Sequence, residues 1–308
     1  RFCWAYDEAQ SLDILTIPNY EETFGSELGA KLSGQFSGPQ YLGGAYRSAV
    51  IRCCYRTPGS ILTAAHALGM GLLREQGILE KKRRAITTKV EWDRMGYSVD
   101  GEFYSNRQIT ISRPPENNGN PLSHYEDLSL VTFKKFTSKD AELEFVTNSI
   151  KQAIFQEGLN PARHLLVIVL GKQAKLFQPI IASKLQQAGI NTYFPGADEI
   201  NKTSINEDSN RSQFWCDEQE QAVTISRVHR AKGNEAYWVF LVGLEQVAME
   251  EEDYILRNQL FVGMTRTKGW LTMTGVSSPD QEEYGLYKEV KKALATPNEI
   301  TFTLRYDN

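Results

Sequence analysis

The chain has 308 residues, of which 41% are hydrophobic and 23% charged. At about 150 residues per domain, this length allows roughly two domains. The composition is that of a globular protein, which excludes a disordered or fibrous chain. The 34 Lys and Arg against 38 Asp and Glu leave a net charge of −4, so a nucleic-acid partner requires a local basic surface.

The lack of an apolar segment and the spacing of the cysteines narrow the class of protein further. No apolar run approaches the roughly 18 residues of a membrane span, and no charged segment followed by an apolar one opens the chain. We therefore predict a cytoplasmic protein without a membrane partner. The four cysteines form no CxxC pair, which argues against a structural zinc site.

The first part of the chain shows little periodicity. A buried strand is predicted over residues 2–6, already in progress where the chain begins at Arg1 without a methionine. We therefore expect a fragment of a larger protein. The next clear elements are a strand near residues 50–54 and a helix over residues 60–73.

Residues 75–127 are polar and irregular, which predicts a surface insertion, with a small antiparallel piece around residues 97–111. Two aromatic residues in this segment, Trp92 and Tyr97, have two interpretations. They could stack on nucleic-acid bases, or they could anchor the insertion to the core, which is the interpretation that we favour.

From residue 128 onward, strands and helices alternate as a parallel α/β sheet requires. The continuous apolar run over residues 165–170 is typical of a strand covered on both faces. The other strands are predicted over residues 128–133, 191–194, 222–226, 237–244 and 270–274. Helices are predicted from a cap at residue 137 or 138 to residue 154, around residues 177–185, and over residues 255–266.

An acidic pair, Asp7 and Glu8, directly follows the first predicted strand. At the carboxyl end of a strand, one carboxylate can hold Mg²⁺ and its neighbour can polarise an attacking water. This is the Walker B chemistry of phosphoryl transfer. The alternative is a turn or a helix N-cap.

Two arginines stand where predicted elements begin or end. Arg56 lies between the strand over residues 50–54 and the helix that follows it, and Arg266 ends the helix over residues 255–266. Because a guanidinium binds phosphate through two donors, either side chain could contact a nucleotide. The alternatives are a surface arginine for Arg56 and a partner of the helix dipole for Arg266.

The segment over residues 228–235, Val-His-Arg-Ala-Lys-Gly-Asn-Glu, joins two predicted strands. Gly233 permits a close approach of the backbone to a ligand, the cations suit phosphates, and Glu235 could accept hydrogen bonds from a ribose. For His229 a structural role is the alternative.

In this order the four segments resemble the motifs of UvrD/Rep-like superfamily 1 helicases. Residues 7–10 are similar to motif II, residues 55–58 to motif IV, residues 228–235 to motif V and residues 260–268 to motif VI. Motifs V and VI are the specific part of the resemblance.

The resemblance implies an α/β fold of the RecA-like P-loop NTPase type, with a parallel sheet flanked by helices. Residues 1–50 would be the remnant of a first lobe and residues 51–308 the second helicase lobe, with a polar insertion at about residues 75–127. The pattern G-x-x-x-x-G-K-[ST] occurs nowhere in the sequence. In this family the P-loop lies upstream of motif II, so we expect it before Arg1, and the fragment should not hydrolyse ATP unaided.

The resemblance also implies an ATP-driven motor that moves 3′ to 5′ on single-stranded DNA, with ATP and Mg²⁺ between two lobes. On the matching positions, Asp7 would hold the metal and Glu8 would be the catalytic base. Gln10 would sense the nucleotide phosphate. Arg56 and Arg266 would contact the γ-phosphate from the second lobe.

The remaining matches concern the ribose and the nucleic acid. Glu235 would contact the ribose, with Gly233 letting the backbone come close. His229, Arg227 and Arg230 would face the single strand. That strand would be DNA, and RNA is not excluded. A different class of function stays open, namely a helicase-like module that binds nucleic acid or protein without hydrolysis. A nuclease is disfavoured because no second carboxylate cluster has a lysine at the spacing typical of nucleases.

Overall fold

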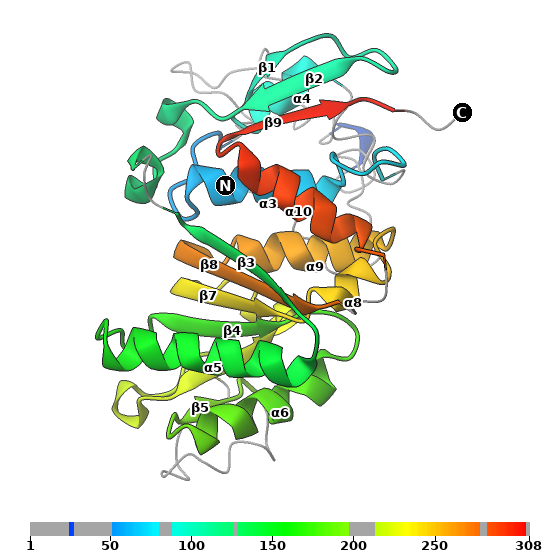
Figure 1. Cartoon of the computed structure of the whole chain (residues 1–308). Coiled ribbons are helices and arrows are strands. Elements are labelled where there is room, and N and C mark those ends of the chain that lie inside the picture. The colour runs from blue at the N-terminus through cyan, green and yellow to red at the C-terminus, as the bar shows by residue number, and fades with distance from the viewer. Residues whose placement is uncertain are drawn as a thin grey trace, which may run out of the picture.

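The computed structural model describes residues 25–27, 51–79, 88–125, 129–196, 213–277 and 282–305, and the structural statements below concern these residues. They form two β-sheets with helices between and below them (Figure 1). The acidic pair of the sequence, Asp7 and Glu8, lies outside the described residues. In the described ranges, no helix combines the length and the apolar character needed to cross a bilayer.

The larger sheet has six strands in the order β3-β8-β7-β4-β6-β5, and every neighbouring pair is parallel. This is the parallel α/β architecture predicted from the alternation of elements. Its strands are β3 (Val131–Phe136), β4 (Leu165–Val169), β5 (Thr192–Tyr193), β6 (Val223–Arg227), β7 (Ala236–Val242) and β8 (Thr267–Val276).

Helices cover both faces of this sheet. In β4, Leu166 and Ile168 pack in one apolar cluster, while Leu165 and Val167 pack in the other, because successive side chains of a strand point to opposite faces. On one face of the sheet, the first cluster packs against α3 (Gly59–Met70), α9 (Tyr254–Met264) and α10 (Gly285–Ala295). On the other face, the second cluster packs against α5 (Lys139–Phe155) and α6 (Ala174–Gln187).

Short helices and turns join these elements. They are α4 (Lys89–Arg94), α7 (Val228–Ala231), α8 (Glu245–Ala248) and the 3-10 turns η3 (Pro115–Asn117), η4 (Pro121–His124) and η5 (Glu218–Glu220). The sequence does not predict them, since each is too short for a periodic apolar pattern.

Capping residues set the helix ends that matter most here. Ser138 begins α5, as predicted, because its side chain accepts a hydrogen bond from the Ala141 amide at 3.2 Å. Asp253 caps α9 through the amides of Ile255 and Leu256. The helix ends at Met264, two residues earlier than predicted, so that Arg266 lies in the turn that leads into β8.

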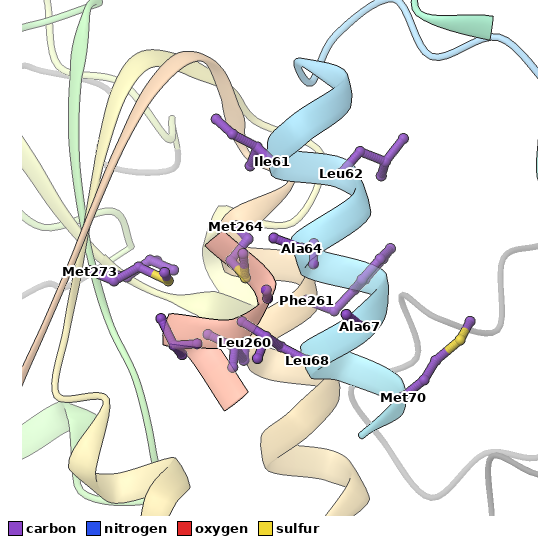
Figure 2. Packing of buried hydrophobic residues seen from close by; sticks show 14 of the residues in the cluster. Ile61, Leu62, Ala64, Ala67, Leu68, Met70, Leu260, Phe261, Met264 and Met273 are labelled. Atoms are coloured by element: carbon purple, nitrogen blue, oxygen red, sulfur yellow. The ribbon is translucent and has the colours of Figure 1, made fainter. Parts of the chain in front are cut away.

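The pair α3 and α9 runs antiparallel across the sheet. Thr57, just before α3, donates to the carbonyl of Thr265, just after α9. At the other end, Arg257 donates to the carbonyl of Leu68 near the end of α3. Small side chains let the helices approach closely, and a Cβ at Gly69 would lie 3.0 Å from that of Phe261. Figure 2 shows the interleaved side chains, among them Ala64, Ala67, Leu68, Leu260, Phe261 and Met264.

The smaller sheet is antiparallel, in the order β1-β2-β9, and lies above the layer of α3 and α10 (Figure 1). Its strands are β1 (Ser98–Asp100), β2 (Gln108–Ser112) and β9 (Glu299–Thr303). The antiparallel piece predicted around residues 97–111 is therefore present. Its pairing with β9 was not predicted, and it joins the segment 75–127 to the last part of the chain.

The aromatic residues of this segment anchor it to the core. Trp92 is 0% exposed, and both Trp92 and Tyr97 belong to the apolar cluster around α3, so the core-anchor interpretation is confirmed and base stacking is excluded. The Tyr97 hydroxyl lies 2.8 Å from Nδ1 of His66 on α3. Burial lowers the pKa of His66 to about 3, which keeps this imidazole neutral.

The strand predicted near residues 50–54 is wrong over its described part. Residues 51–53 carry no strand, and Cys54 forms only an isolated bridge with Asn118. This stretch is paired with a loop instead of a sheet. Cys53 and Cys54 are partly buried there, whereas Ile51 is exposed.

Candidate nucleotide site

The residues predicted from motifs IV and VI lie side by side. The hydroxyl of Thr57 donates to the carbonyl of Thr265 at 3.2 Å, although the two residues are 208 positions apart in the chain. Both are buried. Because Arg56 and Arg266 are the immediate neighbours of this pair, the antiparallel helices α3 and α9 bring the two predicted arginines to one place.

A second link between these segments comes from Asn120. Its side-chain amide donates to the carbonyl of Arg56 at 2.5 Å and to the carbonyl of Lys268 at 2.9 Å. The residue is 3% exposed. Sequence reasoning missed Asn120, although an Asn directly before a Pro at a helical turn is a recognisable capping signal.

Arg56 is suited to bind an anion. Its side chain is 31% exposed, and its nearest carboxylate, on Glu235, is 4.0 Å from Nε. That Nε is buried and has no hydrogen-bond partner among the described residues. The partly exposed guanidinium suits a phosphate oxygen, so this side chain fits the phosphate of a nucleotide.

Glu235 lies between two cations. It is 4.0 Å from Arg56 and 3.4 Å from Nζ of Lys268. The partners are exposed enough for solvent to weaken both ion pairs. The ammonium of Lys268 also lies 4.4 Å above the ring of Tyr237, a favourable cation–π arrangement. Neither Lys268 nor Tyr237 was among the predicted site residues.

Arg266 is 1% exposed and held tightly. Its Nε donates to the carbonyl of Val262 at 3.0 Å, and one terminal nitrogen donates to the Thr265 hydroxyl at 3.3 Å. The carbonyl of Arg266 accepts from the amide of Ala236 at 3.0 Å. Since Ala236 follows Glu235, the structure brings Arg56, Glu235 and Arg266 together at the amino ends of β7 and β8.

Gly233 is required by its backbone conformation. Its φ is +89°, in the left-handed region that residues with a Cβ rarely adopt. A Cβ there would meet nothing within 4 Å. The glycine therefore allows the chain to turn back toward β7, and the surrounding space is open.

The predicted strand-binding residues lie apart from this site. Arg227 ends β6 opposite Val169 of β4, whereas β7 begins just after Glu235 and pairs Trp238 with Leu165 of the same strand. Because β4, β6 and β7 are parallel, Arg227 lies at the carboxyl ends of the strands and Glu235 lies at their amino ends. His229 and Arg230 follow Arg227 on α7, and all three side chains are exposed.

The metal and base predictions cannot be placed in the same way. Asp7, Glu8 and Gln10 all lie outside the described residues. Across the part of the chain that is described, no three His, Cys, Asp or Glu side chains gather to form a metal site. The assignment of Mg²⁺ to Asp7 stays a prediction.

One segment of the chain matches a known protein family. Residues 222–274 match the family model of the UvrD-like helicase C-terminal domain. This UvrD-like segment runs from β6 through α9 to β8 and contains Gly233, Glu235 and Arg266. The resemblance predicted from motifs V and VI is confirmed for this part of the chain.

Other comparisons add little to the UvrD-like match. No curated protein sequence is significantly similar to this chain. Among solved structures, the C-terminal domain of a possible DNA helicase from Lactobacillus plantarum WCFS1 is similar at 17% identity and a TM-score of 0.38, over 54% of this chain and 83% of that one. A likeness at this level establishes neither a shared function nor a shared detailed fold.

Proposed function

We propose that this chain is the second lobe, with a remnant of the first, of a cytoplasmic, ATP-dependent superfamily 1 motor that moves 3′ to 5′ on single-stranded DNA. The observation that supports it most is the convergence of Arg56, Glu235 and Arg266, which come from three separate segments, at one edge of the sheet. The match of residues 222–274 to a UvrD-like helicase domain supports the same proposal.

The chemistry of this site suits phosphoryl transfer. Negative charge develops on the γ-phosphoryl oxygens in the transition state, and an arginine placed there contributes on the order of 10³ to 10⁵ in rate. Arg266 is held by Val262 and Thr265, while the Arg56 guanidinium is partly exposed. Glu235 would accept hydrogen bonds from the ribose hydroxyls, since its carboxylate is partly exposed beside the arginines.

The other assignments complete the proposal. Asp7 would hold Mg²⁺, which neutralises phosphate charge when bound, Glu8 would act as the base and Gln10 would sense the phosphate. These three residues belong to the proposed remnant of the first lobe. Hydrolysis would then require the two lobes to close on one another, with a P-loop supplied by sequence before Arg1.

Single-strand-stimulated ATP hydrolysis tests the function. We expect full-length protein to hydrolyse ATP slowly alone, and on the order of tenfold faster or more with a single-stranded oligonucleotide, because strand binding promotes lobe closure. Release of phosphate is measured with DNA and RNA oligonucleotides of the same sequence. Protein that binds the strand and ATP but releases no phosphate would be the non-hydrolysing module instead.

The residues proposed to face the strand make a separate prediction. Replacing Arg227 and Arg230 together by Ala should weaken single-strand binding and reduce the slope of log K against log salt by about 1.4, since each lost phosphate contact removes about 0.7. Fluorescence anisotropy over a salt series measures both. The control replaces Lys151 and Lys292, exposed cations on α5 and α10, and an equal effect there would show that only net charge matters.

A further inference from the structure

A loop between the small sheet and β3 lies along the segment that carries Arg56. We name residues 113–123 the bracket. The amide of Cys54 donates to the carbonyl of Asn117 at 3.1 Å, and the amide of Gly119 donates to the carbonyl of Cys54 at 2.9 Å. Further on, the amide of Gly59 donates to the Ser123 hydroxyl at 2.9 Å. The bracket is therefore fixed to the Arg56 segment on both sides of that arginine.

Arg113 anchors the base of the bracket in the core. Its guanidinium donates to the side-chain oxygen of Asn118 and to three carbonyls, those of Met95, Arg52 and Asn117, at 2.6 to 3.0 Å. It is buried and lies 5.1 Å from the centre of the Tyr97 ring. This arginine joins the small sheet, the bracket and the start of the Arg56 segment in one hydrogen-bonded unit.

Close packing prevents the bracket and the Arg56 segment from sliding past each other. A Cβ at Gly59 would lie 2.4 Å from the side-chain oxygen of Asn118, and a Cβ at Gly119 would lie 2.4 Å from the ring of Tyr55. Real Cβ atoms essentially never come so close. The two glycines therefore mark places where the surfaces are in contact without a gap.

Asn120 lies where the bracket meets the segment that follows Arg266. Its amide nitrogen has two hydrogens, and it donates to two carbonyls, on Arg56 and on Lys268. Its oxygen accepts from the amide of Leu122 at 2.9 Å. One buried side chain thus spans the two backbone segments that carry the two arginines.

We propose that Asn120 is a positioning residue that sets the separation between Arg56 and Arg266. The bracket transmits this restraint from the small sheet, which gives that sheet a role at the nucleotide site. The inference rests on the proposed ATP hydrolysis, because that reaction is what the spacing of the arginines serves.

Asn120→Asp tests this with little change of shape. The new carboxylate keeps the oxygen that accepts from Leu122 but has no hydrogen to donate, and its charge faces two carbonyl oxygens. In full-length protein we expect kcat for stimulated ATP hydrolysis to fall by about 10²-fold, as small misplacements of catalytic groups do. The KM for ATP and the affinity for the single strand should change little.

Asn117→Asp is the matched control. The Asn117 side-chain amide donates to the carbonyl of Gly96 at 3.0 Å and joins neither the Arg56 segment nor the segment after Arg266, so kcat should remain within about twofold of wild type. Amide exchange gives a second readout. Asn120→Asp alone should speed exchange at Gly59, whose amide donates to Ser123 of the bracket, and at Gly269, whose amide donates to Thr267. If thermal melting shows that Asn120→Asp is unfolded, Asn120→Ala removes the same two donors without adding a charge.

The outcomes separate the inference from the proposed function. Wild-type protein that hydrolyses ATP, together with Asn120 variants that match Asn117→Asp in kcat and exchange, would overturn the positioning role and leave the function intact. Wild-type protein without hydrolysis would end the proposed function. In that case, amide exchange at Gly59 and Gly269 still decides whether Asn120 holds the two segments, and unchanged exchange overturns it.

Discussion

Arg266→Lys in full-length protein should lower the kcat for strand-stimulated ATP hydrolysis by about 10³-fold, the lower range for loss of an arginine finger. The planar guanidinium is fixed by donors to the carbonyl of Val262 and the hydroxyl of Thr265. A lysine keeps the charge but cannot reproduce this fork, because its single ammonium cannot make both bonds and still reach a phosphate. Steady-state phosphate release at saturating single strand measures the effect.

Binding and stability controls make this result specific. Affinity for the single strand should be unchanged, since Arg227 and Arg230 lie at the other edge of the sheet. Arg163→Lys is a matched substitution at an arginine that pairs with Glu218 and donates to the carbonyls of Ala162 and Cys216, none of which is a residue of the candidate site. Normal turnover in folded Arg266→Lys protein would show that Arg266 is a structural residue of the turn before β8.

Glu289→Ala should destabilise the fold by about 3 to 5 kcal/mol, the usual cost of leaving one partner of a buried ion pair uncompensated. Arg257 is 0% exposed and donates to both carboxylate oxygens of Glu289, at 3.0 and 2.8 Å. Arg257 also donates to the carbonyls of Glu251 and Leu68. The pair therefore ties α9 to α10 and to the end of α3. Urea unfolding followed by circular dichroism gives the free energy of unfolding.

A double variant distinguishes the cost of an unpaired buried charge from the cost of a lost side chain. Replacing Arg257 by Met and Glu289 by Leu together should recover most of the lost stability, because apolar residues of similar volume can replace a buried ion pair. Lys291→Ala serves as a surface control, since its contact with Glu283 is exposed and should cost no more than about 1 kcal/mol. Equal losses in the single and double variants would contradict the ion-pair explanation.

The sequence predicts the six-stranded sheet well because β4 and most of β7 are continuous apolar runs and the other strands alternate regularly with helices. Each of its six strands overlaps a predicted one, within a few residues. The small sheet is harder to predict, since β9 lies about 190 residues from its partner β2 and short polar-faced strands carry little signal. The helix α10 was overlooked, although Leu286, Val290 and Ala293 recur at helical spacing and are buried.

In the candidate site, too, some residues could be predicted from the sequence and others could not. Arg56, Glu235 and Arg266 were predicted together, since each stands in a recognisable motif, and the structure brings them together. The contacts of Asn120 with the carbonyls of Arg56 and Lys268 depend on tertiary packing, so the sequence shows at most a helix cap at Asn120 and not its link to the arginines. The end of α9 is harder to predict, because the Thr265 amide still donates to the carbonyl of Phe261 as in the helix, whereas the Arg266 amide donates to Gly263 in a tighter turn.

The antiparallel arrangement of α3 and α9 has an electrostatic consequence at the candidate site. The amino end of α3, with its partial positive charge, lies beside the carboxyl end of α9, with its partial negative charge, so that the two backbone fields largely cancel there. Attraction for an anion at this edge therefore comes from side chains, namely Arg56, Arg266 and Lys268. Substitutions at these cations change the local potential directly, with no helix terminus to compensate for them.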